Sequence, residues 1–168
     1  MRTKWRQWAV RSVLVGVGAT ASMDLGGEIV RRTTGVPPLN YGLLGRWIGH
    51  MPSGRFAHES ILTAPPVRRE LELGTVAHYS IGISFAGLLL ASRPGWVDRP
   101  TLGPAMAVGV GSTIAPWLLM QPAFGMGIAG SKTPNPTVGR FRSLRAHAIY
   151  GLGLYLSGQA VTRLSRLG

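Results

Sequence analysis

Apolar residues dominate four stretches of the chain, each about as long as the ~20 residues that an α-helix needs to cross the hydrocarbon of a bilayer. These stretches lie at about 8–30, 73–92, 101–120 and 146–162. The second and third contain no charged residue, and a helix of that kind needs apolar surroundings on every side. A small soluble domain has too little core to supply them. The pattern therefore predicts an all-α integral membrane four-helix bundle, a single transmembrane domain over 1–168.

Composition agrees with a lipid environment. Of the 168 residues, 14% are charged, against roughly 25% in an average soluble domain, and mean hydropathy is positive. The chain has no cysteine. Disulfides, thiolate metal ligands and cysteine nucleophiles are therefore excluded.

The chain has a net charge of +12, and its basic residues flank the predicted spans instead of forming one stripe. Such flanks anchor spans to anionic lipid headgroups, and no interleaved aromatic and basic platform points to nucleic acid. Membrane lipids are therefore the expected partners, and no nucleic acid is expected. The basic residues are Arg2, Lys4 and Arg6 before the first span, Arg31 and Arg32 after it, and Arg68 and Arg69 before the second. Five tryptophans also lie near span ends, where indoles favour the interface: Trp5, Trp8, Trp47, Trp96 and Trp117.

The N-terminus imitates a secretory signal, with a basic region, a short apolar run and Ala19-Thr20-Ala21. Asp24 and Glu28 lie directly beyond, on what reads as the same helix. We therefore expect an uncleaved first span.

Four spans place both termini at one membrane face and the first and third connections together at the other. These connections, 31–72 and 121–145, are long and rich in Gly, Pro and polar residues, and loops of that length are uncommon unless functional or disordered. Lys and Arg nearly balance between the two faces, but those ahead of the first span favour cytoplasmic termini. The second connection is short and carries no evident chemistry.

The same topology gathers the polar residues of the spans and long connections at one face, which we call the vestibule. Its arginine and lysine favour an anionic ligand. The predicted ligand-binding residues are Asp24, Arg46, His50, His58, His78, Gln121, Ser131, Lys132 and His147.

Asp24 and His78 lie inside the predicted spans at similar depth, where an unpaired charge costs about 2 kcal/mol or more. We expect both to face inward and to pair with each other. The alternatives for Asp24 are a hydrogen bond that ties helices together or an ion pair with an arginine. For His78 the alternative is a neutral imidazole bonded between helices, and for His147 an interfacial position.

A short helix is predicted within the stretch LLGRWIGHMPSGRFAHESI. Its apolar residues recur at spacings of one, three and four, while Arg46 and His50 share the opposite face. Such a helix lies flat at the membrane interface until Pro52-Ser53-Gly54 turns the chain. The alternative is a helix that only covers the ends of the loops. The apolar residues are Leu43, Leu44, Trp47, Ile48 and Met51.

Two glycine motifs resemble nucleotide-binding loops but fail on context. GMGIAG follows a span instead of a strand, and GMGIAGSKT has one residue too many for a Walker A loop. An anion resting on Ser131, Lys132 and the glycine amides stays open. A zinc site of the four histidines and Asp24 is a further alternative, but it lacks regular ligand spacing. No cofactor or metal site is predicted.

Small residues four positions apart predict close helix contacts, and they also allow a homo-oligomer. These pairs are Gly18 and Ser22, Ser80 and Ser84, and Ala107 and Gly111.

The stretches MDLGGEIVRRTTGVPPLNYGLLGRWIGHMPSGRFAHESI, LGTVAHYSIGISFAGLLL, PWLLMQPAFGMGIAGSKTPNP and RSLRAHAIYGLGLYL resemble a bacterial family of small inner-membrane proteins known as domain of unknown function 2938. The likeness runs from Gly16 to Leu156. It implies a multi-pass protein with four transmembrane helices in the bacterial cytoplasmic membrane. It brings no reaction and therefore no catalytic residues.

Two functions stay open. The preferred one is a non-enzymatic protein that binds, or helps to move, a small polar or anionic molecule, a proton or a lipid headgroup in the vestibule. The alternative is a membrane enzyme, lipid-modifying or metal-dependent, with Asp24 or a histidine as base.

Overall fold

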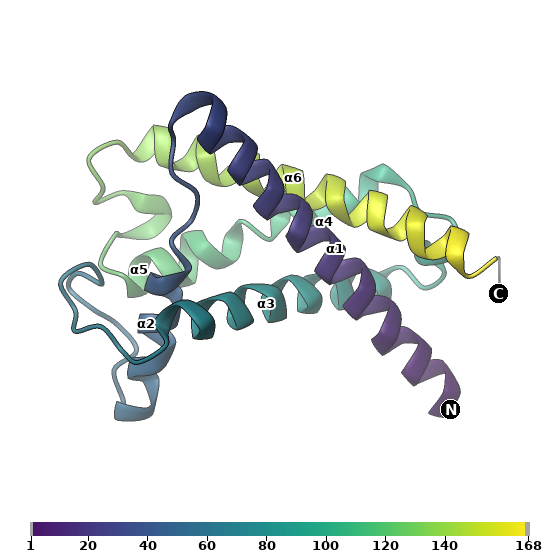
Figure 1. Cartoon of the computed structure of the whole chain (residues 1–168), viewed down its shortest axis with the longest axis horizontal. Helices are drawn as coiled ribbons and strands as arrows, with labels where there is room; N and C mark the ends of the chain where they lie inside the picture. The colour runs from purple at the N-terminus through teal and green to yellow at the C-terminus, as the bar shows by residue number, and fades with distance from the viewer. Residues whose placement is uncertain (1, 167–168) are drawn as a thin grey trace. The chain divides into compact units, whose positions relative to one another are not determined.

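The computed structural model describes the backbone of residues 2–166 and the side chains of residues 5–166. Helices make up 75% of the structure, and no strand occurs in the described residues. The side chains of Arg2 and Lys4, predicted as membrane anchors, lie outside the described part. In chain order (Figure 1) the elements are α1 (Arg2–Thr34), α2 (Tyr41–His50), η1 (Met51–Ser53), α3 (Glu70–Ser92), η2 (Trp96–Asp98), α4 (Leu102–Gly111), η3 (Pro116–Met120), α5 (Gln121–Ala123), η4 (Ile128–Gly130) and α6 (Pro136–Leu164).

The chain forms two compact units, and each is described by itself. The helix unit comprises Met1–Pro38, Tyr79–Gly111 and Ala146–Gly168. The connection unit comprises Leu39–His78 and Ser112–Arg145, and it therefore holds most of both long connections. Whether the chain is a single transmembrane domain stays a prediction.

Three helical segments in the described residues are long and apolar enough to cross a membrane: Trp5–Thr34, Glu70–Ser92 and Leu102–Ala123. They overlap the first three predicted spans. The fourth predicted span, 146–162, lies inside the continuous helix α6, which is not among these three. Polar residues such as His147 and Gln159 dilute its apolar character.

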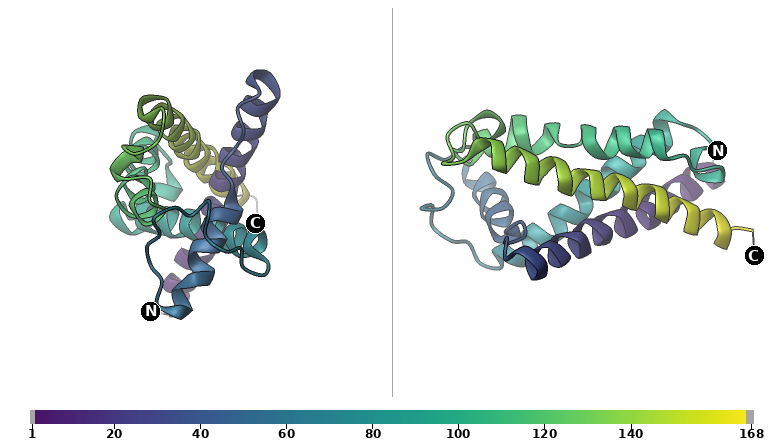
Figure 2. Two further views of the ribbon diagram at one scale, coloured as in Figure 1. Left: turned by 90° about the vertical axis from the view of Figure 1, so that its left-hand side faces the viewer. Right: turned by 90° about the horizontal axis from the view of Figure 1, so that it is seen from above.

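Small residues bring the helices of the helix unit into close contact. A Cβ atom added to Gly109 of α4 would lie 2.3 Å from the Cα of Gly151 of α6, and one on Gly16 of α1 would lie 2.5 Å from the Cα of Ile83 of α3. Figure 2 shows α6 running alongside α4. The core of this unit includes Val15, Ala19, Ala86, Leu89, Ala105 and Leu154, all wholly buried.

One predicted small-residue pair is confirmed as a helix contact and two are wrong. A Cβ atom added to Gly18 would lie against the Ser157 side chain, and one added to Gly153 would lie against the Ser22 side chain. In α3 and α4 the contacts are made instead by Gly82 and Gly109, each of which lies midway between the two predicted residues of its helix. A shift of two residues reaches nearly the opposite side of a helix with 3.6 residues per turn. The four residues predicted instead are exposed: Ser80, Ser84, Ala107 and Gly111.

Two prolines interrupt the third candidate span. Pro116 and Pro122 have no N–H to donate to the preceding turn, and the chain answers with a π-helical segment, Pro116–Met120, in which the Gln121 amide donates to the Pro116 carbonyl. Such segments often mark functional sites. This segment continues into α5 and then into the turn at Ala123–Gly125.

The second connection is not the plain loop expected. Trp96 is buried against α6 instead of lying at an interface, since an added Cβ on Gly158 would fall 2.8 Å from its ring. The Thr162 hydroxyl donates to the Val97 carbonyl, and Arg11 pairs with Asp98 at 3.1 Å. The short connection therefore ties three helices of the helix unit together.

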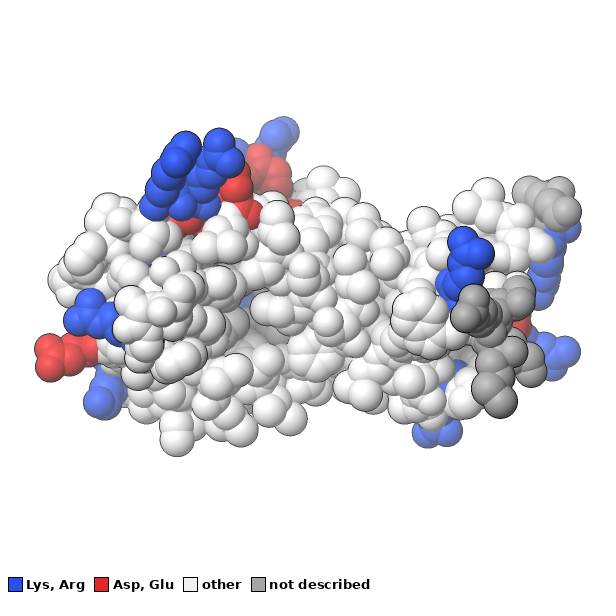
Figure 3. Space-filling model, turned by 90° about the horizontal axis from the view of Figure 1, so that it is seen from below, with Lys and Arg blue, Asp and Glu red and all other residues white. Residues whose placement is uncertain are grey.

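Large apolar side chains lie exposed along the helices. Leu25, Leu88 and Leu118 expose 62%, 55% and 59% of their surface. On the face drawn in Figure 3, most of the surface belongs to residues other than Lys, Arg, Asp and Glu. Such surfaces fit lipid as the surrounding solvent.

Gly109→Ala tests the helix contacts. Its Cβ would meet the α6 backbone at Gly151, so we expect unfolding in detergent to become easier by about 1–3 kcal/mol, the usual cost of overpacking. Gly111→Ala is the matched control, because nothing lies within 4 Å of its added Cβ. Equal melting temperatures for the two variants would contradict the contact.

Candidate functional site

The connection unit is built on a backbone crossing between α2 and α3. The Asn40 side chain caps α2 by accepting from the Gly42 amide at 2.9 Å. An added Cβ on Gly45 would fall 1.7 Å from the Glu70 carbonyl oxygen, and one on Gly74 would fall 1.8 Å from that of Tyr41. Glycine is therefore required on both helices for this approach.

The predicted short helix forms, and its apolar face packs against protein. Leu44 and Trp47 are buried in a cluster with Ile61, Ala123 and Phe124. The Trp47 indole N–H donates to the Phe56 carbonyl at 2.8 Å. The face expected to lie on the membrane is thus covered by the two long connections.

Arg46, on the opposite face of α2, is held by several protein acceptors. It makes a two-pronged contact with the Glu70 carboxylate, at 2.9 and 2.8 Å, and its remaining nitrogen donates to the carbonyls of Ile61 and Ala64. The contact with Glu70 raises the Arg46 pKa. The pair is partly buried, since the two side chains expose 14% and 23% of their surface. Arg46 therefore serves to join α2, the 61–64 segment and α3.

The two long connections meet through the backbone. The His58 amide donates to the Ala123 carbonyl at 2.9 Å, and the Ile61 amide donates to the Phe124 carbonyl at 3.1 Å. Gly125 follows with φ +81°, and an added Cβ would lie 1.9 Å from the Glu59 carbonyl oxygen. This contact carries His58 into the interior.

His50 and His58 form a hydrogen-bonded pair in the connection unit. His50 Nδ1 lies 2.8 Å from His58 Nε2, so one ring donates and the other accepts. His58 exposes only 9% of its surface, while His50 is half-buried. The pair thus connects the accessible side of the unit with its interior.

The His58 pKa lies below its usual range. Burial is the main cause, and the nearby His50 and Arg55 lower it further, whereas the Ala123 carbonyl opposes the shift. The His58 ring is therefore neutral at pH 7.

Three buried polar atoms have no hydrogen-bond partner among the described residues: His58 Nδ1, Gln121 Oε1 and Trp117 Nε1. All belong to the connection unit. Leaving a buried polar atom unpaired costs about 1–3 kcal/mol. Such atoms mark places where a ligand or water completes the structure.

Ser131 and Lys132 are exposed and lie in a turn that satisfies its own backbone. The amides of Gly130, Ser131 and Lys132 donate to the carbonyls of Gly127, Ile128 and Met126. These amides hold no free proton for an anion. Anion binding by Ser131, Lys132 and the glycine amides stays a prediction, carried now by the two exposed side chains.

The vestibule residues of α1, α3 and α6 have partners within their own units. In the connection unit, His78 Nε2 lies 3.1 Å from the Tyr41 hydroxyl, and the two rings stack. In the helix unit, the Tyr79 hydroxyl donates to Asp24 at 2.9 Å. His147 is half-buried on α6 in the helix unit. The Asp24–His78 pair, the ligand-binding roles and the enzyme alternative stay predictions.

Three partners in these contacts were missed from the sequence. Glu70 lies 24 positions from Arg46, and no local spacing links them. Tyr41 bonds to His78, and Tyr79 bonds to Asp24. A single tyrosine in a helix does not indicate in the sequence which residue it will bond. The one clue was Glu70, an acidic residue at the start of a candidate span, because a charge that becomes buried there needs a counter-charge.

No group of three or more His, Cys, Asp or Glu with metal-binding arrangement occurs in residues 2–166. Metal binding by histidines stays a prediction. The arrangement that the structure does show is a two-histidine pair suited to hydrogen bonding and proton transfer.

Comparison with known proteins gives one match. The model of a family described as "protein of unknown function (DUF2938)" matches residues 13–161. No curated protein and no solved structure matches the chain.

Stability should fall in acid because of His58. Its folded pKa lies below the unfolded value of ~6.5, so the neutral ring contributes stability above that value. This stability is lost as pH falls through the unfolded pKa toward the folded one. We expect the melting temperature of wild type to exceed that of His58→Gln by more at about pH 8 than at about pH 5.5. A difference that is constant with pH would contradict the shift.

Proposed function

The chain belongs to the DUF2938 family of proteins of unknown function, and we propose that it is a membrane-embedded, non-enzymatic protein that binds a small hydrogen-bond-donating molecule at the His50–His58 pair. The observation that carries this proposal is the buried His58 ring, with one nitrogen bonded to His50 and the other without a partner. A neutral imidazole of this kind accepts a proton or a donor group from a ligand.

We propose α6 as the fourth membrane-spanning helix. Residues 146–162 carry no Asp, Glu, Lys or Arg, and Leu152 and Leu156 expose 45% and 53% of their surface. Exposed leucines on a helix that also packs through glycines suit a lipid-facing side. This completes the predicted four-helix bundle.

With four spans, the two long connections lie at one membrane face and both termini at the other. We place the protein in a bacterial inner membrane with cytoplasmic termini, as the charges ahead of the first span favour. The connection unit, with α2 near the interface, then faces the periplasm.

The contacts favour a donor over an anion as the ligand. Arg46, the strongest predicted anion ligand, is already bonded to Glu70 and two carbonyls. Of the three unpartnered atoms, Gln121 Oε1 only accepts, His58 Nδ1 accepts in one neutral tautomer, and Trp117 Nε1 only donates. Two of the three are thus acceptors. Ammonium groups, hydroxyl groups and the hydrated proton match these acceptors.

Thermal unfolding of the full chain in nanodiscs tests the proposal with methylammonium chloride and sodium sulfate as probes. Binding to the folded state raises the melting temperature. We expect methylammonium to stabilise wild type more than His58→Gln. Sulfate, which stabilises folded proteins generally by exclusion from their surface, should shift the two melting temperatures equally.

Glu59→Gln is the matched control, because Glu59 is the exposed neighbour of His58 in the same segment. It should respond to methylammonium as wild type does. A larger sulfate shift in wild type than in His58→Gln, or an equal response of the two proteins to methylammonium, would overturn the proposed site.

A further inference from the structure

The connection between α3 and α4 forms a rigid turn in the helix unit. Gly95 has φ +81°, a conformation that favours glycine. The Trp96 amide donates to the Arg93 carbonyl at 3.0 Å, and the Arg99 amide donates to the Trp96 carbonyl at 3.1 Å. These bonds fix where the two arginine side chains leave the backbone.

Trp96 gives this turn a solid base. Its ring is 6% exposed and packs against Gly158 of α6. Its indole N–H is used by the Thr101 carbonyl at 3.1 Å. The indole is therefore not available to a ligand as a donor, and it acts as an apolar wall.

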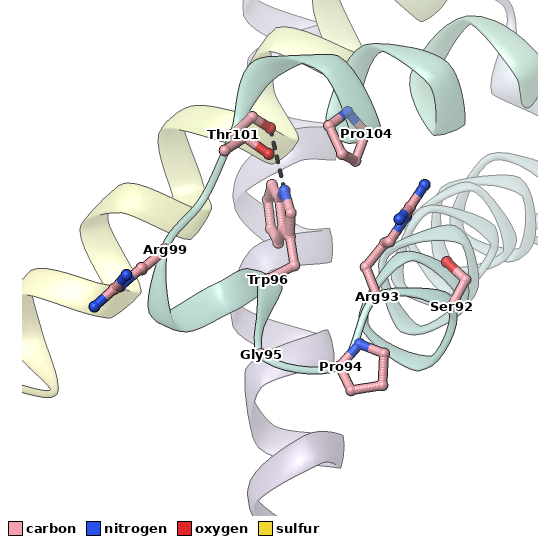
Figure 4. Close-up of a pocket in the computed structure, with 8 residues that line it drawn as sticks. All are labelled: Ser92, Arg93, Pro94, Gly95, Trp96, Arg99, Thr101 and Pro104. Atoms are coloured by element: carbon pink, nitrogen blue, oxygen red, sulfur yellow. Dashed lines mark hydrogen bonds between the residues drawn. The ribbon is translucent and has the colours of Figure 1, made fainter.

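A cavity of about 470 Å³ opens beside this wall, lined by Arg93, Trp96, Arg99, Thr101 and Pro104 among others. Figure 4 shows Arg93 on one side of the Trp96 ring, extending toward Pro104, and Arg99 on the other side, pointing away from the indole. Arg93 is therefore the residue best placed to reach a molecule in the cavity.

Neither arginine forms an ion pair with an acidic side chain of the described residues. The nearest acid along the chain, Asp98, already pairs with Arg11 at 3.1 Å. Arg93 and Arg99 are both exposed, and a guanidinium binds phosphate oxygens with two parallel hydrogen bonds. The cavity is therefore suited to an anion.

The cavity also lies at the ends of two candidate spans. One span ends at Ser92 and the next begins at Leu102, and both residues flank the turn. Residues between the ends of two membrane-crossing helices lie at the level of the lipid headgroups. Phosphate groups are the anions present at that level.

We propose that the α3–α4 turn binds the phosphate group of a membrane lipid, with Arg93 as its principal ligand and Arg99 as a second positive charge. The chemistry recognised is a phosphate ester, and inorganic phosphate is the soluble alternative source. This site is separate from the His50–His58 pair and does not rest on the function proposed for it.

Native mass spectrometry of the full chain tests the site with phosphatidylglycerol, and with a galactosyl diacylglycerol that has matching acyl chains and no phosphate. We expect wild type to retain phosphatidylglycerol preferentially. Retention should fall about tenfold in Arg93→Gln, the loss expected for about 1.4 kcal/mol of a charge-assisted contact, and less in Arg99→Gln. Arg93→Lys keeps the charge without the two-pronged geometry and should lie between Arg93→Gln and wild type.

Arg163→Gln is the matched control, since it removes one exposed positive charge from the same unit outside the cavity. Melting temperatures equal to wild type confirm that the variants are folded. Equal losses in Arg93→Gln and Arg163→Gln, or equal retention of the galactolipid and phosphatidylglycerol, would overturn the site. Displacement of the lipid by inorganic phosphate would support the phosphate chemistry and assign it to a soluble source.

Discussion

The backbone contact between residues 58–61 and the turn at Ala123–Gly125 is the interaction on which the connection unit depends. Two amide-to-carbonyl bonds join segments that lie far apart in the chain, and the missing side chain of Gly125 lets the Glu59 carbonyl approach. Closing such a loop costs conformational entropy, and the contact offsets this cost only if the backbone groups of both segments are hydrogen-bonded. The same contact places His58 where burial lowers its pKa and where its ring bonds to His50.

Several parts of this arrangement were predictable from the sequence. Long apolar windows and helix periodicity sufficed for the three candidate spans and for α2, because apolar length and spacing are properties of one segment. The grouping of the two long connections followed from the order of spans, since consecutive crossings alternate between faces. The histidine pair is consistent with that grouping, but only the structure shows that His50 and His58 bond to each other.

Other parts depend on rotation and packing, which a single sequence does not determine. In α3 and α4, small residues occur on two faces of the helix, and the pattern does not say which face meets a neighbour. Trp96 looks interfacial by position, yet Gly158 on a distant helix provides the space that buries it. Arg46 looks like an anion ligand until Glu70 is placed beside it. Each case involves a partner remote in sequence.

Sided cysteine labelling tests whether the two long connections lie at a single membrane face, as proposed. The chain has no cysteine, so single replacements at Phe56, Thr137 and Ser165, all exposed, report unambiguously. We expect an impermeant reagent to label positions 56 and 137 from the same side of sealed vesicles and position 165 from the other. Labelling of 56 and 137 from opposite sides would show that the two connections do not share a face.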